Sequence, residues 1–413
     1  MRLMSHTEVL VAGEATTTPS PIKVCMHILK TARNDYRVMR DATALVEAGF
    51  SVTIIDVESE RARPVEEDID GVHLKHIIAP NWFTPTRFKP WFLAKLVLMI
   101  ICGAVQLLRT QADIYHAHIE KALPACFIAA HLHRKPLIFD APELPLEDPN
   151  ITRWRKLNAL ATYLLAKMLP RCAGIITVSS PSVEEIRKRY CVPEVTLIRN
   201  VPVYRAISKS DRLRQHLGLG PEVRIALYQG FLQPDRRLDR LVRAASFLDP
   251  NIIIAMMGKG VGTTQSQLEA LIVSEGVADR VKIIPSVPYE ELLDWTASAD
   301  IGLIIYTPDY SLNVQVMLPN KLFEYLMAGL PVLASPLEAT AEVIRKYDVG
   351  QIISSLAPAD VGAAINTMLA DQVALDRMHH NALAAAQQEF CWEKERIKLV
   401  RLYHDILGIQ NTE

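Results

Sequence analysis

The chain has 413 residues, half of which are hydrophobic, and a formal net charge of −1 at pH 7. This length exceeds what one hydrophobic core supports and predicts two domains of roughly 180 residues each. The near-neutral charge excludes a global electrostatic field that would gather nucleic acid or repel acidic partners. The six cysteines lack C-x-x-C spacing and nearby histidine pairs, so they predict neither a zinc site nor a disulfide framework and fit a reducing cytoplasm.

The N-terminal residues 1–20 are rich in Thr, Ser and Pro and contain no apolar core of signal-peptide length. We therefore expect a flexible tail and no export. The longest apolar run, 96–108, is shorter than the about 20 residues that a helix needs to cross a bilayer. No membrane span is predicted.

The first half of the chain alternates strand and helix patterns. A helix is predicted over 35–48, between two apolar strands. Near-continuous apolar strands in this order are typical of a parallel sheet covered on both faces, which predicts an α/β domain over residues 21–202. Its predicted strands are 22–29, 50–57, 112–118, 136–141, 174–180 and 195–200.

A polar stretch that reaches Pro221 interrupts the pattern, and the same scheme then repeats over residues 203–388. No short sequence repeat accompanies it, so we expect two similar Rossmann-like domains and not a repeat array. The predicted strands are 224–230, 251–258, 280–286, 301–306, 331–335 and 350–354. An amphipathic helix is predicted over 392–407, and its pattern alone allows it to dock on its own domain.

The segment 318–332 reads LPNKLFEYLMAGLPV and is the most informative part of the chain. Asn320 is a good N-cap, an apolar helical face follows, and Gly329 ends the helix before a buried strand. The start of such a helix presents unpaired backbone N–H groups and a positive dipole end, which suit a phosphate. Glu324 lies one turn further and could reach a ribose diol. The alternative is a capped helix packed between two strands.

This segment resembles the signature of the group 1 (family 4) retaining glycosyltransferases of GT-B fold, in the variant where PNK-x-FEY precedes AG-x-PV. The resemblance implies two Rossmann-like domains facing across a cleft, with the C-terminal residues 389–413 forming a helix that packs back on the N-terminal domain. It also implies that Glu324 holds the nucleotide ribose. The first of the two glutamates in the family signature lies eight positions earlier, where this chain has Val316, so the chain departs from the family at that position.

During sugar transfer, negative charge grows on the leaving diphosphate, so fixed cations and hydrogen-bond donors of the protein must face the diphosphate. Gly230 follows an apolar strand, and Arg236 matches the second of two cationic positions of the family, whereas Phe231 replaces the first. We expect Arg236 to bind phosphate and Arg237 to be a surface residue. Gly258 follows another strand and allows close backbone approach. The remaining donor contacts implied by the resemblance are Asn320, Lys321 and Glu324.

The N-terminal domain should contact the acceptor and the sugar. Asp35, Arg37 and Arg40 open a predicted helix, and the two arginines share one helical face that could meet an anionic acceptor or the donor phosphate. The alternative is an exposed helix face with surface ion pairs.

Further candidates close two strands at the carboxyl edge of the sheet, where such sheets gather their sites. His118 is the candidate for contact with the sugar, although a lone histidine at a strand end is more often structural. Asp140 and Glu143 match a D-x-H-E pattern of relatives, with Pro142 in place of the histidine. Either carboxylate could orient the acceptor hydroxyl or accept its proton.

No D-x-D motif precedes a suitable loop, and the family neutralises the diphosphate with cations and helix ends, so neither a metal nor another cofactor is expected. The expected partners are a nucleotide-sugar donor and a glycan or lipid-linked acceptor. No sequence feature indicates nucleic acid binding, and the oligomeric state is left open.

Residues 72–112 contain no acidic residue, and 151–171 repeat this pattern. Basic, aromatic and apolar stretches of this kind can lie on an anionic membrane surface, which predicts a cytoplasmic protein that can associate with the inner face of the membrane. The alternative is that 96–108 is a buried helix of the N-terminal domain, and both can hold together. The residues are Lys75, Trp82, Phe83, Arg87, Phe88, Lys89, Trp91, Phe92, Lys95 and Arg109, then Arg153, Trp154, Arg155, Lys156 and Lys167.

Three functions are compatible with the sequence. The leading one is a retaining glycosyltransferase that moves a sugar to a glycan or lipid-linked acceptor in cell-surface polysaccharide or glycolipid synthesis. The second is a nucleotide-sugar 2-epimerase of the same architecture. The third is a non-catalytic binding subunit. The departures from the family at Val316, Phe231 and Pro142 keep it open, as does Ile119, which follows His118 where relatives commonly have an aspartate.

Overall fold

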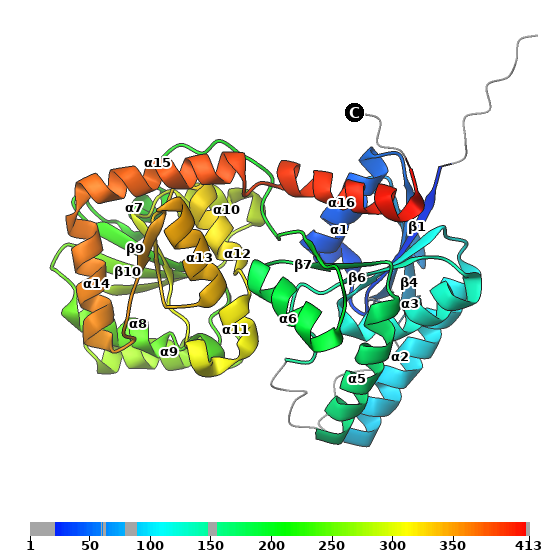
Figure 1. Cartoon of the computed structure of the whole chain (residues 1–413). Coiled ribbons are helices and arrows are strands. Elements are labelled where there is room, and N and C mark those ends of the chain that lie inside the picture. Colours follow the sequence, from blue (N-terminus) through cyan, green and yellow to red (C-terminus); the bar gives the residue numbers. More distant parts are fainter. Residues whose placement is uncertain (1–20, 59, 61–62, 79–88, 148–154, 410–413) are drawn as a thin grey trace, which may run out of the picture.

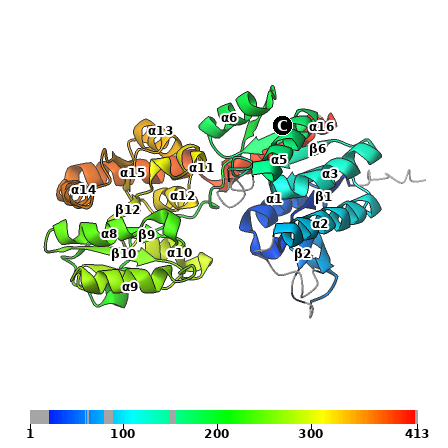
Figure 2. The same cartoon turned by 90° about the horizontal axis from the view of Figure 1, so that it is seen from below.

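The protein is described by a computed structural model over residues 21–58, 60, 63–78, 89–147 and 155–409. It consists of two α/β domains that lie end to end (Figures 1 and 2). The chain passes between them after β8 and again from α15 to α16. The expected tail at 1–20 lies outside the described residues.

The N-terminal domain contains an eight-stranded sheet in the order β3-β4-β2-β1-β5-β6-β7-β8. All neighbours pair in parallel except β3 and β4, which are antiparallel. The six predicted strands are present, and the β3–β4 hairpin at one edge is an addition that the sequence pattern did not predict. The strands are β1 (Lys23–His27), β2 (Ser51–Glu58), β3 (Glu66–Ile69), β4 (Val72–Ile78), β5 (Ile114–His118), β6 (Leu137–Asp140), β7 (Gly174–Thr177) and β8 (Thr196–Leu197).

Helices cover this sheet. The predicted helix over 35–48 is confirmed as α1, and Asp35 caps it by accepting hydrogen bonds from two backbone N–H groups of its first turn. The helices are α1 (Tyr36–Glu47), α2 (Lys89–Arg109), α3 (Ile119–His133), α5 (Arg155–Met168) and α6 (Ser180–Tyr190), with short 3-10 turns at Ala32–Asn34 and Leu169–Arg171. Within the described residues, no helix combines the length and the apolar character that crossing a membrane requires.

The C-terminal domain contains a six-stranded, all-parallel sheet in the order β11-β10-β9-β12-β13-β14. Its strands all fall within predicted ranges. They are β9 (Arg224–Gln229), β10 (Ile252–Met257), β11 (Val281–Ile284), β12 (Ile301–Ile304), β13 (Val332–Ala334) and β14 (Gly350–Ile352). The helices are α7 (Arg212–Leu217), α8 (Asp239–Ala244), α9 (Thr264–Ser274), α10 (Tyr289–Thr296), α11 (Leu312–Val316), α12 (Asn320–Met327), α13 (Glu338–Tyr347), α14 (Pro358–Ala370) and α15 (Gln372–Gln388), with 3-10 turns at Pro234–Arg236, Ala245–Phe247 and Pro308–Tyr310.

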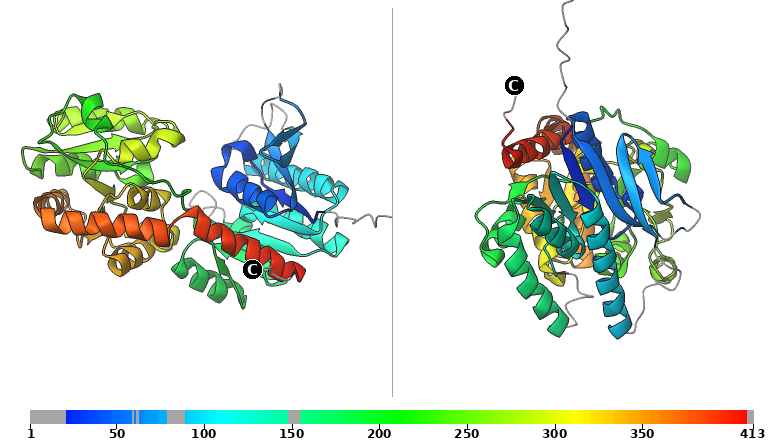
Figure 3. Two further views of the ribbon diagram at one scale, coloured as in Figure 1. Left: turned by 90° about the horizontal axis from the view of Figure 1, so that it is seen from above. Right: turned by 90° about the vertical axis from the view of Figure 1, so that its right-hand side faces the viewer.

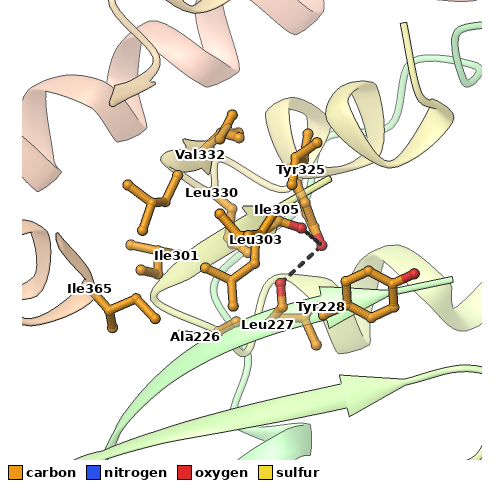
Figure 4. Close-up of a cluster of buried hydrophobic side chains, with 14 of the residues drawn as sticks. Ala226, Leu227, Tyr228, Ile301, Leu303, Ile305, Tyr325, Leu330, Val332 and Ile365 are labelled. Carbon is orange, nitrogen blue, oxygen red and sulfur yellow. Dashed lines mark hydrogen bonds between the residues drawn. The ribbon is translucent and has the colours of Figure 1, made fainter. Parts of the chain in front are cut away.

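Tyr325 fixes helix α12 against this sheet (Figure 4). Its ring lies over Gly302 of β12, where an added Cβ would come within 2.5 Å of the ring. Its hydroxyl donates to the Leu227 carbonyl at 2.9 Å and accepts from the Gln229 N–H at 3.1 Å. Because ring and hydroxyl are both engaged, the position of α12 relative to β9 and β12 is set by one buried side chain.

The start of α12 differs from the prediction by one residue. Pro319 occupies the N-cap, and Asn320 is already helical, so Asn320 does not cap the helix. The Asn320 side-chain oxygen instead accepts a hydrogen bond from the Asn200 amide at 3.0 Å. The helix ends as predicted before Gly329, which has a positive φ of 69°.

The predicted C-terminal helix is α16 (Trp392–Leu407), and its apolar face lies in the core of the N-terminal domain. Figure 3 shows it continuing from α15 and lying along the other domain. The Tyr403 hydroxyl shares a hydrogen bond of 2.8 Å with His116 of β5, and Glu395 pairs with Arg199 at 2.7 Å. The helix therefore docks across the domain boundary and not on its own domain.

Candidate functional site

Two predicted glycines meet at the carboxyl edge of the C-terminal sheet. Gly230 follows β9, and Gly258 follows β10. A Cβ added at Gly258 would lie 1.9 Å from the Gly230 carbonyl oxygen, so the two turns approach to a distance that only glycine permits. Gly230 has a positive φ of 122°, and a Cβ added there would lie 3.2 Å from Lys321 Nζ. The glycine turns thus open directly toward the first turn of α12.

Two cations share the rings of two tyrosines beside these glycines. Lys321 Nζ lies 3.7 Å from the ring centre of Tyr228 and 5.2 Å from that of Tyr306, and the Arg236 guanidinium lies 4.7 Å from the Tyr306 ring. Such cation–π contacts hold cations without neutralising them. Within the described part of the chain, Lys321 forms no salt bridge, and Arg236 has only a long contact of 3.5 Å with Asp235. We name Lys321, Arg236, Tyr228 and Tyr306 the cation pair and its tyrosines.

The environment acts differently on the two cations. Burial, helped by the neighbouring Arg236 charge, lowers the pKa of Lys321 well below its usual range. Burial also acts against the charge of Arg236, but the adjacent Tyr306, Asp235 and Glu143 groups leave its pKa raised. The contribution of Glu143 places this exposed carboxylate of the N-terminal domain in electrostatic range of the C-terminal cations. Two cations this close favour a ligand with two negative charges.

The carboxylate of Glu324 is held on the same helix, one turn further along. It accepts a short hydrogen bond from the Gln229 side-chain amide, whose oxygen accepts from the Thr296 hydroxyl at 2.8 Å. Burial raises the pKa of Glu324, while Gln229 and Lys321 act in the opposite direction. Five of the six predicted donor residues therefore converge around α12 and the two glycine turns, and Asn320 lies at the edge, against the interdomain linker.

The sequence did not indicate Tyr228, Tyr306, Gln229 or Thr296. The signal was available for three of them, because Tyr228 and Gln229 close β9 and Tyr306 follows β12, which is the sheet edge where parallel strands gather their sites.

The predicted catalytic residues His118 and Asp140 lie together at the end of neighbouring strands, and both are buried. His118 Nδ1 lies 3.2 Å from Asp140 Oδ2, and Arg37 donates to the two oxygens of Asp140 at 2.9 and 2.7 Å. Although burial alone would raise the pKa of Asp140, Arg37 and His118 hold it well below its usual range. Arg37 is 6% exposed, so the alternative of an exposed, solvated helix face is wrong.

Asp35 and Arg40, which were predicted with Arg37 to contact the acceptor or a phosphate, also have partners within the chain. Asp35 caps α1 and pairs with Lys30 at 2.5 Å. Arg40 stacks on Trp392 at 4.1 Å and donates to Asn200 at 2.9 Å and to the Val201 carbonyl. The geometry assigns Arg40 to the linker between the domains. An acceptor contact by Asp35, Arg37 or Arg40 stays a prediction.

Ligand atoms of His116, His118 and Asp140 lie within 4.8 Å of one another, which is a spacing that metal sites use. The two rings stack at 4.1 Å, and burial lowers the pKa of His116 well below its usual range. The Asp140 oxygens face the permanently charged Arg37, which disfavours a second cation beside them. A metal is therefore not supported by the chemistry of this cluster.

Val316, at the position matched to the first glutamate of the family signature, contacts the other domain. Its side chain is 3% exposed and belongs to the N-terminal apolar core, and its carbonyl accepts from the hydroxyls of Ser179 and Ser182. Asn313 of the same short helix accepts from the Leu144 N–H at 2.8 Å. In this chain, α11 therefore contacts the N-terminal domain through Val316 and Asn313.

Comparisons with known proteins match both domains. A family model described as Glycosyltransferase Family 4 matches residues 37–201, and one described as Glycosyl transferases group 1 matches 209–385. The D-inositol 3-phosphate glycosyltransferase of Nocardia farcinica is 24% identical over 392 residues, covering 89% of this chain and 83% of that protein. The enzyme of the same name from Thermobispora bispora is 26% identical over 395 residues, covering 90% and 89%.

Solved structures share the fold. Sucrose-phosphate synthase from Thermosynechococcus elongatus superposes with a TM-score of 0.77 at 16% identity, covering 94% of this chain and 100% of that chain. HepE from Anabaena, in complex with UDP and glucose, gives a TM-score of 0.69 at 15% identity, covering 93% and 100%. With both domains matched in sequence and in fold, the chain belongs to the group 1 and family 4 glycosyltransferases of GT-B fold.

Proposed function

We propose that this glycosyltransferase moves a sugar from a nucleotide-diphosphate sugar to a hydroxyl of a glycan or lipid-linked acceptor, with retention of configuration. The observation that carries the donor assignment is the cation pair. Two cations are held on tyrosine rings without a strong anionic partner among the described residues, and Lys321 lies next to the turn at Gly230. A diphosphate supplies the missing charges.

Each part of the donor has a matching group. The diphosphate lies against Arg236, Lys321 and the N-terminal turn of α12, where helix dipole and side-chain charges act together. Glu324, oriented by Gln229, accepts hydrogen bonds from the ribose diol. Solved relatives of the same fold support a nucleotide sugar, since HepE was solved with UDP and glucose.

The proposed acceptor side of the site lies across from the cation pair. Glu143 is exposed and interacts electrostatically with Arg236, and we propose that it orients an acceptor hydroxyl near the leaving phosphate. His118 has its Nε2 buried and without a hydrogen-bond partner in the described structure, so contact with the sugar requires movement of its surroundings. In the proposed reaction the donor C–O bond to phosphate breaks, the acceptor oxygen bonds to the same sugar carbon, and its proton passes to the leaving phosphate.

Calorimetry with a panel of nucleoside diphosphates and nucleotide sugars tests the donor site. We expect selective binding by the wild type. Arg236→Met and Lys321→Met should each weaken it by about 10- to 150-fold, because each removes a charge-assisted contact of about 1.5–3 kcal/mol. Arg237→Met is the matched control, since Arg237 is half exposed and pairs with Asp239. No nucleotide binding by the wild type contradicts the proposal and favours a non-catalytic binding subunit.

Product analysis separates the remaining alternative. A transferase consumes the nucleotide sugar slowly without an acceptor and rapidly with one. A nucleotide-sugar epimerase converts the donor without any acceptor, so equal conversion in both conditions would support epimerisation instead.

A further inference from the structure

The helix α2 exposes a continuous apolar face on the side away from the core. Its inner face packs on the N-terminal domain through Met99, Ala104 and Leu107, which are buried. On the opposite side Ile101 is 53% exposed, and Trp91, Leu98 and Val105 line up with it at helical spacing. The expectation of a buried helix is therefore correct for one face only.

The helix α5 repeats this arrangement. Leu160 is 54% exposed and Tyr163 is 60% exposed, three residues apart, and Lys167 follows on the same face with its ammonium 5.7 Å from the Tyr163 ring. Figures 1 and 3 show that α2 and α5 both project beyond the rest of the N-terminal domain on the same side. We name the exposed faces of these helices, with Trp91, Leu98, Ile101, Val105, Leu160 and Tyr163, the apolar ridge.

The charges of the two helices have one sign. Neither Lys89–Arg109 nor Arg155–Met168 contains an aspartate or glutamate, whereas each contains lysine and arginine. A surface that combines apolar and aromatic side chains with cations fits an anionic lipid interface, where the cations meet head groups and the rings enter the acyl boundary. The predicted contributors Trp82, Phe83, Arg87, Phe88, Arg153 and Trp154 lie outside the described residues.

From this charge complementarity we infer that the apolar ridge docks the enzyme on an anionic membrane surface. A second copy of the chain fits less well, because neither helix offers a carboxylate that could pair with the exposed Lys167 of the other copy. The inference goes beyond the proposed function, since it rests on the ridge and its charges and not on the donor site.

Sedimentation of the full-length protein with vesicles tests the inference. We expect binding to vesicles of phosphatidylcholine mixed with phosphatidylglycerol, weaker binding to phosphatidylcholine alone, and a decrease with added salt. Ile101→Glu and Tyr163→Glu should each lower the partition coefficient by about tenfold or more, because a carboxylate enters an apolar interface facing anionic lipid. Lys167→Gln should lower it by about fivefold on the anionic vesicles only. Val273→Glu is the matched control, since Val273 is 75% exposed on α9 of the other domain.

The outcomes are distinguishable. Absence of vesicle binding, or equal binding by the ridge variants and the wild type, overturns the inference. A dimer in solution that Ile101→Glu dissociates, without vesicle binding, assigns the ridge to a second copy instead. Nucleotide binding measured on the same variants should be unchanged, so loss of vesicle binding with intact nucleotide binding leaves the proposed function standing. Vesicle binding without any nucleotide binding contradicts only the proposed function.

Discussion

Replacing Arg37 by methionine should destabilise the protein strongly. Arg37 and Asp140 are 6% and 1% exposed and share two hydrogen bonds of 2.9 and 2.7 Å. Removal of one partner leaves a buried carboxylate without its counter-ion, which costs about 3–5 kcal/mol. This is a large part of the about 5–15 kcal/mol that holds a typical domain folded. Urea unfolding of wild type and variant, followed by circular dichroism, measures the difference.

The pH dependence gives a second and independent readout. In the wild type, Arg37 holds the pKa of Asp140 below its unfolded value of about 3.9, so this stabilisation is present above that pH and lost as the pH falls through the lower folded value. In Arg37→Met, burial raises the pKa of Asp140 instead. Protonation then relieves the buried charge, so the stability difference between variant and wild type should shrink as the pH falls.

Two further variants sharpen this test. Arg237→Met removes an exposed arginine whose ion pair with Asp239 should contribute below about 1 kcal/mol. The double variant Arg37→Met with Asp140→Leu removes both charges and should recover much of the stability lost by Arg37→Met. A loss below about 1 kcal/mol for Arg37→Met, unchanged between neutral and acidic pH, would refute the assignment of this pair as a buried structural ion pair.

The other predictions concern the glycine turns, the docked C-terminal helix and the cation pair. Gly258→Ala should abolish nucleotide binding in calorimetry, because the added Cβ would lie 1.9 Å from the Gly230 carbonyl oxygen. Gly262→Ala is the control: the added Cβ meets open space, so this variant should lose only about 1–2 kcal/mol of stability to backbone strain and bind nucleotide normally. Equal nucleotide binding by the two variants would contradict this prediction. Tyr403→Phe should lower the free energy of unfolding by about 1–3 kcal/mol, because buried His116 loses its 2.8 Å hydrogen bond to the Tyr403 hydroxyl. An unchanged midpoint in urea unfolding would contradict this prediction. Nucleotide binding should be accompanied by proton uptake, because burial lowers the pKa of Lys321 and a bound diphosphate favours its charged form. Calorimetry in buffers of different ionisation enthalpy measures this uptake. The variant Lys321→Met should show none.

Much of the fold followed from local patterns in the sequence. Apolar runs between helical segments located the predicted strands, and the amphipathic period located α16 to the residue. The β3 strand, EEDI, was missed because it is a polar edge strand whose pattern does not differ from that of a loop. The N-cap of α12 was misplaced by one residue because Pro319 and Asn320 both suit a helix start.

The site was less accessible from the sequence because its interactions are long-range. Arg37 and Asp140 are 103 positions apart, so periodicity could not show that the arginine is buried in an ion pair. The same holds for the approach of Lys321 to Tyr228. The convergence of Gly230, Gly258 and Glu324 was predictable, because the residues that follow parallel strands gather at one edge of the sheet.

Helix α11 connects the contact between the two domains to the start of α12. Val316 is buried in the N-terminal core, and three residues separate it from the first turn of α12, which carries Lys321 of the proposed donor site. Under the proposed function, a shift of α12 on donor binding would also displace Val316, so donor binding and the contact between the domains would be coupled. By thermodynamic reciprocity, the free energy by which nucleotide binding changes the interdomain equilibrium equals that by which the interdomain equilibrium changes nucleotide affinity.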